Sequence, residues 1–174
     1  MTTQSRYPYQ LKLYSPNDPD FMVHSRFSNP IFPEDDLIIS TCRGYLCFTN
    51  WAIEPNPRGR YLVGQFECAL PYLKWLLGVM ARFKLRPEQG GYPPPGTMYD
   101  IVQLDKENEL YVFRGAHHGN NGLMIYVLEN RKRHSYINAQ MSQEFDLYDV
   151  YLEDHGLMQV LLDIQQQYED GQLL

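Results

Sequence analysis

Long apolar runs are the first thing that this 174-residue chain lacks. Its longest apolar stretch, residues 70–81, is interrupted by Pro71, Lys74 and Gly78, whereas a membrane-spanning helix needs about 20 consecutive apolar residues. Residues 1–6 have no apolar core of the kind that a signal peptide requires. We therefore expect neither membrane association nor export, and we expect a cytoplasmic location.

Cysteine is also scarce, with only Cys42, Cys47 and Cys68 in the chain. An odd number of cysteines, in a chain long enough to fold without crosslinks, favours a reducing compartment over a disulfide framework. Cys42 and Cys47 are five residues apart, which is not the spacing of zinc knuckles or redox pairs. Cys68 precedes a predicted helix, whose dipole can activate a thiol, but we favour a packed cysteine there. We predict no metal ion and no cofactor.

The signatures of common enzymes and of nucleic-acid binding are missing too. Glycines in the ranges 90–91 and 119–122 lack the strand–glycine–helix context of a phosphate-binding loop, and no GxSxG, HExxH or calcium-loop pattern occurs. The basic residues 131–133 form a small patch in a chain of net charge −6, so nucleic-acid binding is not expected. The acidic residues 34–36 lie near prolines and are predicted to form a solvated loop rather than a cation site.

What the sequence does contain is typical of one globular domain. Apolar residues make up 44% of the chain and charged residues 21%, values close to the average for folded proteins. No internal repeat or break in composition divides residues 1–174. Tyrosine is frequent, with 14 residues, and tyrosine suits both half-buried strands and binding surfaces. We expect a single domain.

Periodicity predicts the elements of this domain. Apolar residues at spacings of three and four predict two main helices, at about 68–84 and 155–169, the second of them capped by Asp154. Arg43 and Gly44 fit a two-residue hairpin turn. The predicted strands are residues 9–14, 37–42, 45–49, 99–104, 110–114, 123–128 and 135–138, with 129–134 as a solvated run and 145–152 as an edge strand. This order predicts an α+β fold, in which both helices pack on a mostly antiparallel β-sheet.

Charge is unevenly distributed along the chain. Residues 142–174 contain eight acids and no lysine or arginine, a charge of −8, whereas residues 43–86 contain seven basic residues and two acids, a charge of +5. The two segments can attract each other within the fold. Alternatively, an acidic C-terminal surface attracts a basic partner and repels nucleic acids and membranes.

The acidic segment and the missing catalytic motifs together favour a non-enzymatic protein-binding protein. Small acidic α+β domains occur among inhibitors and immunity proteins that neutralise toxins, often nucleases, and this analogy of class suggests a basic toxin or nuclease as the partner. The residues expected to contact the partner are Glu144, Asp146, Tyr148, Asp149, Tyr151, Glu153 and Asp154.

Two alternatives remain open. Residues 114–122 form a glycine-flanked segment that carries His117 and His118, and imidazoles in a loop between strands can transfer protons or bind a metal ion. The protein would then be a small metal-dependent or histidine-based enzyme, although glycine and asparagine in this segment also favour an ordinary turn. The second alternative is a homo-oligomeric scaffold protein.

Overall fold

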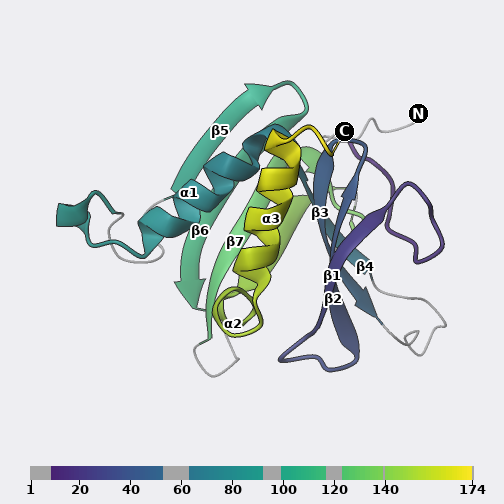
Figure 1. Cartoon of the computed structure of the whole chain (residues 1–174), viewed down its shortest axis with the longest axis horizontal. Helices are drawn as coiled ribbons and strands as arrows, with labels where there is room; N and C mark the ends of the chain where they lie inside the picture. The colour runs from purple at the N-terminus through teal and green to yellow at the C-terminus, as the bar shows by residue number, and fades with distance from the viewer. Residues whose placement is uncertain (1–8, 53–62, 92–98, 117–122, 139, 174) are drawn as a thin grey trace.

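The computed structural model describes residues 9–52, 63–91, 99–116, 123–138 and 140–173 of the chain. These residues form two four-stranded antiparallel sheets, three α-helices and two short 3-10 turns (Figure 1). The predicted α+β class is confirmed. The strands form two sheets instead of the single sheet that we expected.

The first sheet consists of four strands that pair in the order in which they follow one another along the chain. They are β1 (Met22–Ser28), β2 (Asp35–Cys42), β3 (Tyr45–Ala52) and β4 (Val63–Ala69). The predicted hairpin between β2 and β3 is confirmed, since Cys42 pairs with Tyr45 across its end. Arg43 and Gly44 form the turn with φ values of 49° and 78°, which is the left-handed geometry that tight hairpin turns require.

The first helix begins later than its periodicity predicts. Cys68 and Ala69, expected to be helical, are the last residues of β4 and still pair with β3. A 3-10 turn, η1 (Leu70–Tyr72), follows and leads into α1 (Leu73–Phe83). Pro71 lies in that turn, where a missing backbone N–H leaves no hydrogen bond unmade.

The second sheet repeats the arrangement of the first, with strand order β5-β6-β7-β8 followed by helices. Its elements are β5 (Tyr99–Asp105), β6 (Asn108–Ala116), β7 (Met124–His134), β8 (Ser142–Tyr148), α2 (Asp149–Glu153) and α3 (Leu157–Glu169), and a 3-10 turn, η2 (Pro87–Gln89), precedes them. Each half of the chain is therefore a four-stranded meander followed by helix.

The prediction of a solvated run at 129–134 and a strand at 135–138 is wrong. β7 continues to His134, because two of its polar side chains are buried and bonded at the junction of the sheets. Asn130 is 0% exposed and donates to the carbonyl oxygen of Glu67 (3.1 Å), and Arg133 is 2% exposed and paired with the Glu67 carboxylate. Residues 135–138 form a bend.

Two predictions about the C-terminal region need correction. The segment predicted as an edge strand over 145–152 is a strand only as far as Tyr148, after which α2 begins. Asp154 does not cap α3, because Gly156 takes the N-cap position with a φ of 82° and no side chain bonds there.

The segment 9–14 does not form the predicted strand, apart from one bridge between Tyr9 and Arg133. Side chains of β4 satisfy its backbone instead: the N–H of Leu11 donates to the Glu67 carboxylate (3.2 Å), and that of Tyr14 donates to Gln65 Oε1 (2.8 Å). The segment thereby covers a small apolar cluster on the outer face of the first sheet, which includes Tyr14, Phe21, Ile38, Cys42 and Cys47.

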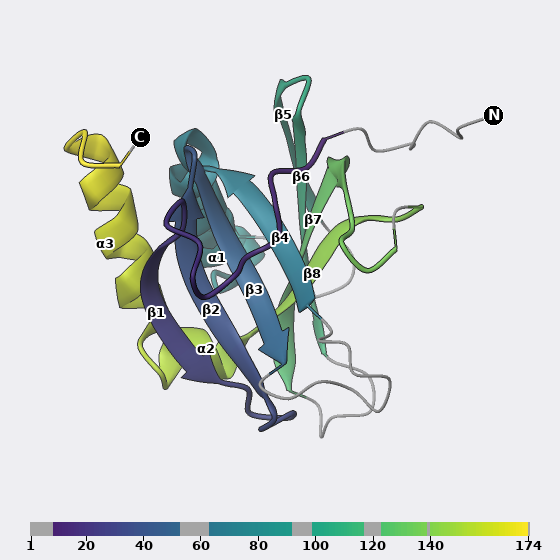
Figure 2. The same ribbon diagram turned by 90° about the vertical axis from the view of Figure 1, so that its right-hand side faces the viewer.

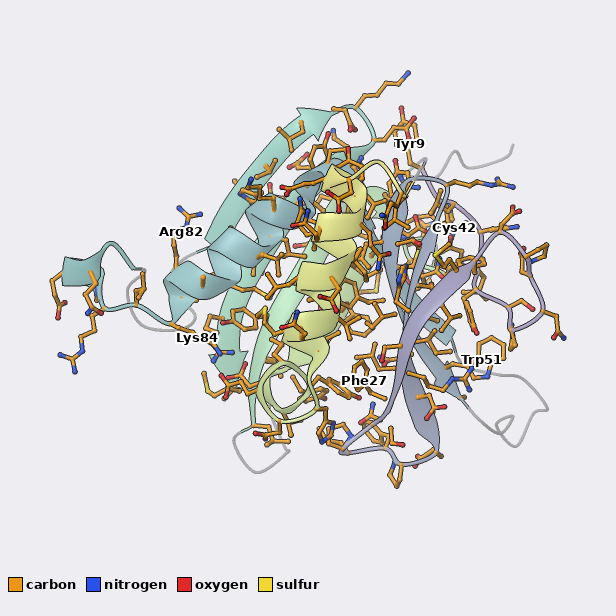
Figure 3. All side chains as sticks on the ribbon, viewed as in Figure 1. Tyr9, Phe27, Cys42, Trp51, Arg82 and Lys84 are labelled. Carbon is orange, nitrogen blue, oxygen red and sulfur yellow. The ribbon has the colours of Figure 1, made fainter. Side chains whose placement is uncertain are left out.

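The two sheets meet where β4 contacts β7 and β8, and α1 and α3 lie in front of the second sheet in Figure 1. Figure 2 shows the sheets at an angle to each other, with α3 beyond β1. One core joins both sheets to the helices, and Phe48, Phe66 and Phe145 lie at its centre with tilted rings. Phe27 of β1 points toward α2 and contacts Tyr151 (Figure 3). No helix within the described ranges is long and apolar enough to cross a membrane.

Candidate functional site

A pocket of about 320 Å³ opens between one end of the first sheet and the edge strand β8. All the charged residues that line it are acidic: Asp35 at the start of β2, and Glu144 and Asp146 on β8. Phe32, Ile137 and Tyr148 add aromatic and aliphatic surface. Three of the seven predicted contact residues thus line one concave site.

The alternation of β8 explains why its acids lie together. Phe145 and Leu147 point into the core and are 4% and 0% exposed. Successive side chains of a strand point to opposite faces, so Glu144, Asp146 and Tyr148 share the other face. That face forms the β8 wall of the pocket.

A short structured loop supplies the opposite side of the pocket. The Asn29 side-chain oxygen accepts hydrogen bonds from the backbone N–H groups of Ile31 (2.9 Å) and Phe32 (3.0 Å). The N–H of Asp35 donates to the carbonyl oxygen of Phe32 (2.8 Å). These bonds fix Asp35 at the pocket wall and hold the Phe32 ring, 46% exposed, at its edge.

Electrostatic repulsion is concentrated in this pocket. Burial raises the pKa of Glu144, and the neighbouring carboxylates of Asp146 and Glu129 raise it further. Burial likewise raises the pKa of Asp35, with added contributions from Glu34 and Asp36. Ionised carboxylates in such a place are stabilised by any cation that enters.

The other predicted contact residues lie elsewhere. Asp149 forms a two-pronged ion pair with the largely buried Arg114, with both N–O distances 2.5 Å. Tyr151 is 1% exposed and belongs to the core. Glu153 pairs with Lys84 at the end of α1 (Figure 3), and Asp154 is exposed on the segment before α3.

The basic triplet at 131–133 is neutralised within the fold. Arg131 bonds Glu129 (3.1 Å), Lys132 lies 3.6 Å from Glu109, and Arg133 is paired with buried Glu67. The expectation that these residues do not form a nucleic-acid patch is consistent with this internal pairing.

The cysteines are buried and form no disulfide. Burial raises the pKa of the Cys68 thiol to about 12, and burial also raises the pKa values of Cys42 and Cys47. A thiol with a raised pKa is a poor nucleophile and metal ligand at neutral pH. No group of metal-ligating side chains occurs in the described part of the chain; His117 and His118 lie outside it.

The contribution of the first sheet to the site was missed from the sequence. Asp35 was interpreted as part of a solvated acidic loop, and Phe32, Asn50 and Ile137 were not considered as site residues. The only local signal is that Asp35 directly precedes the apolar run of β2, which places it at a sheet end. Which other element faces that end depends on how the two sheets pack.

No known protein family matches this sequence, and neither a curated protein nor a solved structure is similar to it.

Proposed function

We propose that this chain is a non-enzymatic protein-binding protein that recognises a basic partner through the acidic pocket between the sheets. The observation that carries the proposal is the uniform charge of the lining, since Asp35, Glu144 and Asp146 come from separate parts of the chain. Such a surface attracts positively charged partners and speeds their association. The partner class we favour is a basic toxin or nuclease, which an inhibitor or immunity-type protein neutralises in the cytoplasm.

The composition of the pocket also supports protein binding. Phe32 and Ile137 are 46% and 66% exposed, and Tyr148 lies deeper in the lining. Aromatic residues beside charged groups are enriched at the centres of protein interfaces, where they contribute most of the binding energy. The acids outside the pocket have a smaller role in the proposal, because Asp149 and Glu153 are already neutralised by basic residues of the same chain.

The test is affinity capture from the native host with the full chain and with Glu144→Gln/Asp146→Asn. We expect the unaltered chain to enrich a basic protein, and the double variant to lose at least tenfold of that enrichment. The affinity of the purified pair should fall as salt rises from about 50 to 500 mM, because the attraction is electrostatic.

The matched control is Asp163→Asn/Asp170→Asn, which changes net charge equally within the same acidic segment but lies on and after α3. It should capture the partner as the unaltered chain does. The proposal fails if nothing is enriched above a tag-only control, or if the pocket variant and the α3 variant behave alike.

A further inference from the structure

Three arginines of this molecule are held in the same way, between a carboxylate that accepts their N–H groups and a tyrosine ring that faces the guanidinium. The sets are Arg114 with Asp149 and Tyr126, Arg131 with Glu129 and Tyr111, and Arg133 with Glu67 and Tyr45. The guanidinium carbon lies 3.7 to 4.4 Å from the centre of the ring in these sets. Both contacts stabilise arginine, by charge-assisted hydrogen bonds and by cation–π attraction.

The acidic pocket presents the same two groups on its walls. Tyr148 lines it together with Glu144 and Asp146 from the second sheet, and Asp35 adds a carboxylate from the first sheet. No lysine, arginine or histidine of the described residues lines it. The pocket therefore has the chemistry of an arginine site whose cation comes from elsewhere.

We propose that this pocket binds an arginine side chain of the basic partner and discriminates against lysine. The inference rests on the proposed function and specifies its anchoring contact. A guanidinium is planar and carries five N–H donors, so it can bond carboxylates of both sheets at once, whereas an ammonium is a compact and strongly hydrated point charge. Phe32 and Ile137 at the edge cover the aliphatic part of the incoming side chain.

The sheet face beside the pocket suits the rest of the partner segment. Val127 of β7 pairs with Asp146, and Phe113 of β6 pairs with Val127, so an apolar row leads away from the acidic wall. α1 and α3 cover the opposite face of this sheet (Figures 1 and 2). Acidic groups beside a half-buried apolar row complement a basic segment that lies extended across the strands.

The experiment titrates three blocked tripeptides into the ¹⁵N-labelled full chain and follows backbone amide shifts by NMR. The probes are Gly-Arg-Gly, Gly-Lys-Gly and the uncharged isostere Gly-citrulline-Gly. We expect saturable shifts at Asn50, Gly64 and Asp146, a Kd for the arginine peptide at least fivefold below that for the lysine peptide, and no saturation with citrulline. Equal Kd values for arginine and lysine would overturn the proposal.

A variant that fills the pocket separates insertion from simple attraction. Gly64 lines the pocket, and a Cβ added there would meet only Ile137 Cδ1, at 3.6 Å. Gly64→Leu should therefore weaken the arginine peptide at least tenfold without changing net charge. Gly78→Leu, at an exposed position on α1, is the control and should bind normally. Asp35→Asn/Glu144→Gln gives a second test that does not depend on how leucine is accommodated.

The outcomes distinguish this proposal from the broader one. If Glu144→Gln/Asp146→Asn abolishes partner capture but Gly64→Leu does not, the acidic surface binds the partner without an inserted arginine, and the pocket proposal is overturned. If the arginine peptide binds but partner capture is unaffected by the acidic variants, the protein-binding function fails instead. Binding that appears only after Arg58→Gln/Arg60→Gln would identify the occupant as the chain's own arginine and would also overturn the proposal.

Discussion

Arg131, Lys132 and Arg133 are consecutive, yet they occupy very different surroundings. Arg131 is 43% exposed beside Glu129, whereas Arg133 is 2% exposed against Glu67, whose side chain is 0% exposed. Glu67 also accepts hydrogen bonds from Tyr136, Gln65 and the backbone of Leu11. This buried cluster joins β4 to β7 and holds the N-terminal segment against both.

Removing Arg133 should therefore be far more costly than removing Arg131. Arg133→Ala leaves a buried carboxylate without its cation, and we expect a loss of about 3–5 kcal/mol of unfolding free energy. Arg131→Ala removes a partly exposed ion pair and should cost less than about 1 kcal/mol. Denaturant titration of both variants measures the difference. Similar losses would show that the cluster does not stabilise the fold, and Glu67→Gln/Arg133→Met should recover part of the loss.

The sequence predicts half of the candidate site at this scale. Alternation along 144–148 and the acidic composition of the C-terminal segment identify Glu144, Asp146 and Tyr148 without a structure. Arg133 and Asp35 could not be assigned in the same way. Both stand in charged runs that resemble solvated loops, and their environments are set by contacts with residues distant in the chain.

At the scale of elements, periodicity found both main helices and the two hairpins that tight or short connections specify. It failed where an element depends on tertiary pairing. The last residues of β4 pair with β3 although their sequence fits a helix. Residues 9–14 alternate like a strand but bond side chains of β4 in place of a neighbouring backbone. The division into two sheets also depends on such long-range contacts.

Two glycines in helical regions should respond to alanine in opposite directions. Gly78 lies within α1 with open space where a methyl group would be added, and Gly156 precedes α3 with a φ of 82°. Gly78→Ala should stabilise the fold by about 0.5–1 kcal/mol, because alanine loses less backbone entropy in a helix. Gly156→Ala should destabilise it by about 1–2 kcal/mol, because a side chain is strained in the left-handed region.

Thermal and denaturant unfolding of the two variants measure these effects, and a third variant tests the cause. Gly156→Asn should cost less than Gly156→Ala, since asparagine tolerates the left-handed region better. Equal losses with alanine and asparagine would mean that backbone strain at the start of α3 is not the reason.

At the scale of the whole molecule, the opposite charges of the two segments are partly matched within the fold. Lys84 pairs with Glu153, and Lys74 lies 3.3 Å from Glu169, so α1 neutralises acids near both ends of the C-terminal helical region. The acids of β8 line the pocket instead. The charge pattern in the sequence thus has both meanings that it allows: part of it holds the fold together, and part of it lies at the pocket.

The repulsion at the pocket should reduce stability at neutral pH. The pKa values of Asp35 and Glu144 are raised in the folded state, so the folded chain holds these protons more tightly than the unfolded chain does. Their ionisation therefore disfavours folding above the raised values, and stability is regained as the pH falls through them toward the ordinary values of 3.8 and 4.5. Asp35→Asn/Glu144→Gln should raise the Tm at pH 7 by about 1–3 °C, a small gain because both groups are partly hydrated.

That gain should shrink as the pH approaches 4, where the unaltered carboxyls are protonated as well. Asp163→Asn/Asp170→Asn changes net charge by the same amount and separates local repulsion from a general effect of charge. A protein keeps a destabilising group where binding needs it, so the variant that melts higher should also be the one that loses the arginine peptide. A higher Tm with unchanged peptide affinity would mean that the repulsion at the pocket serves no binding role, and a lower Tm would mean that these carboxylates stabilise the fold.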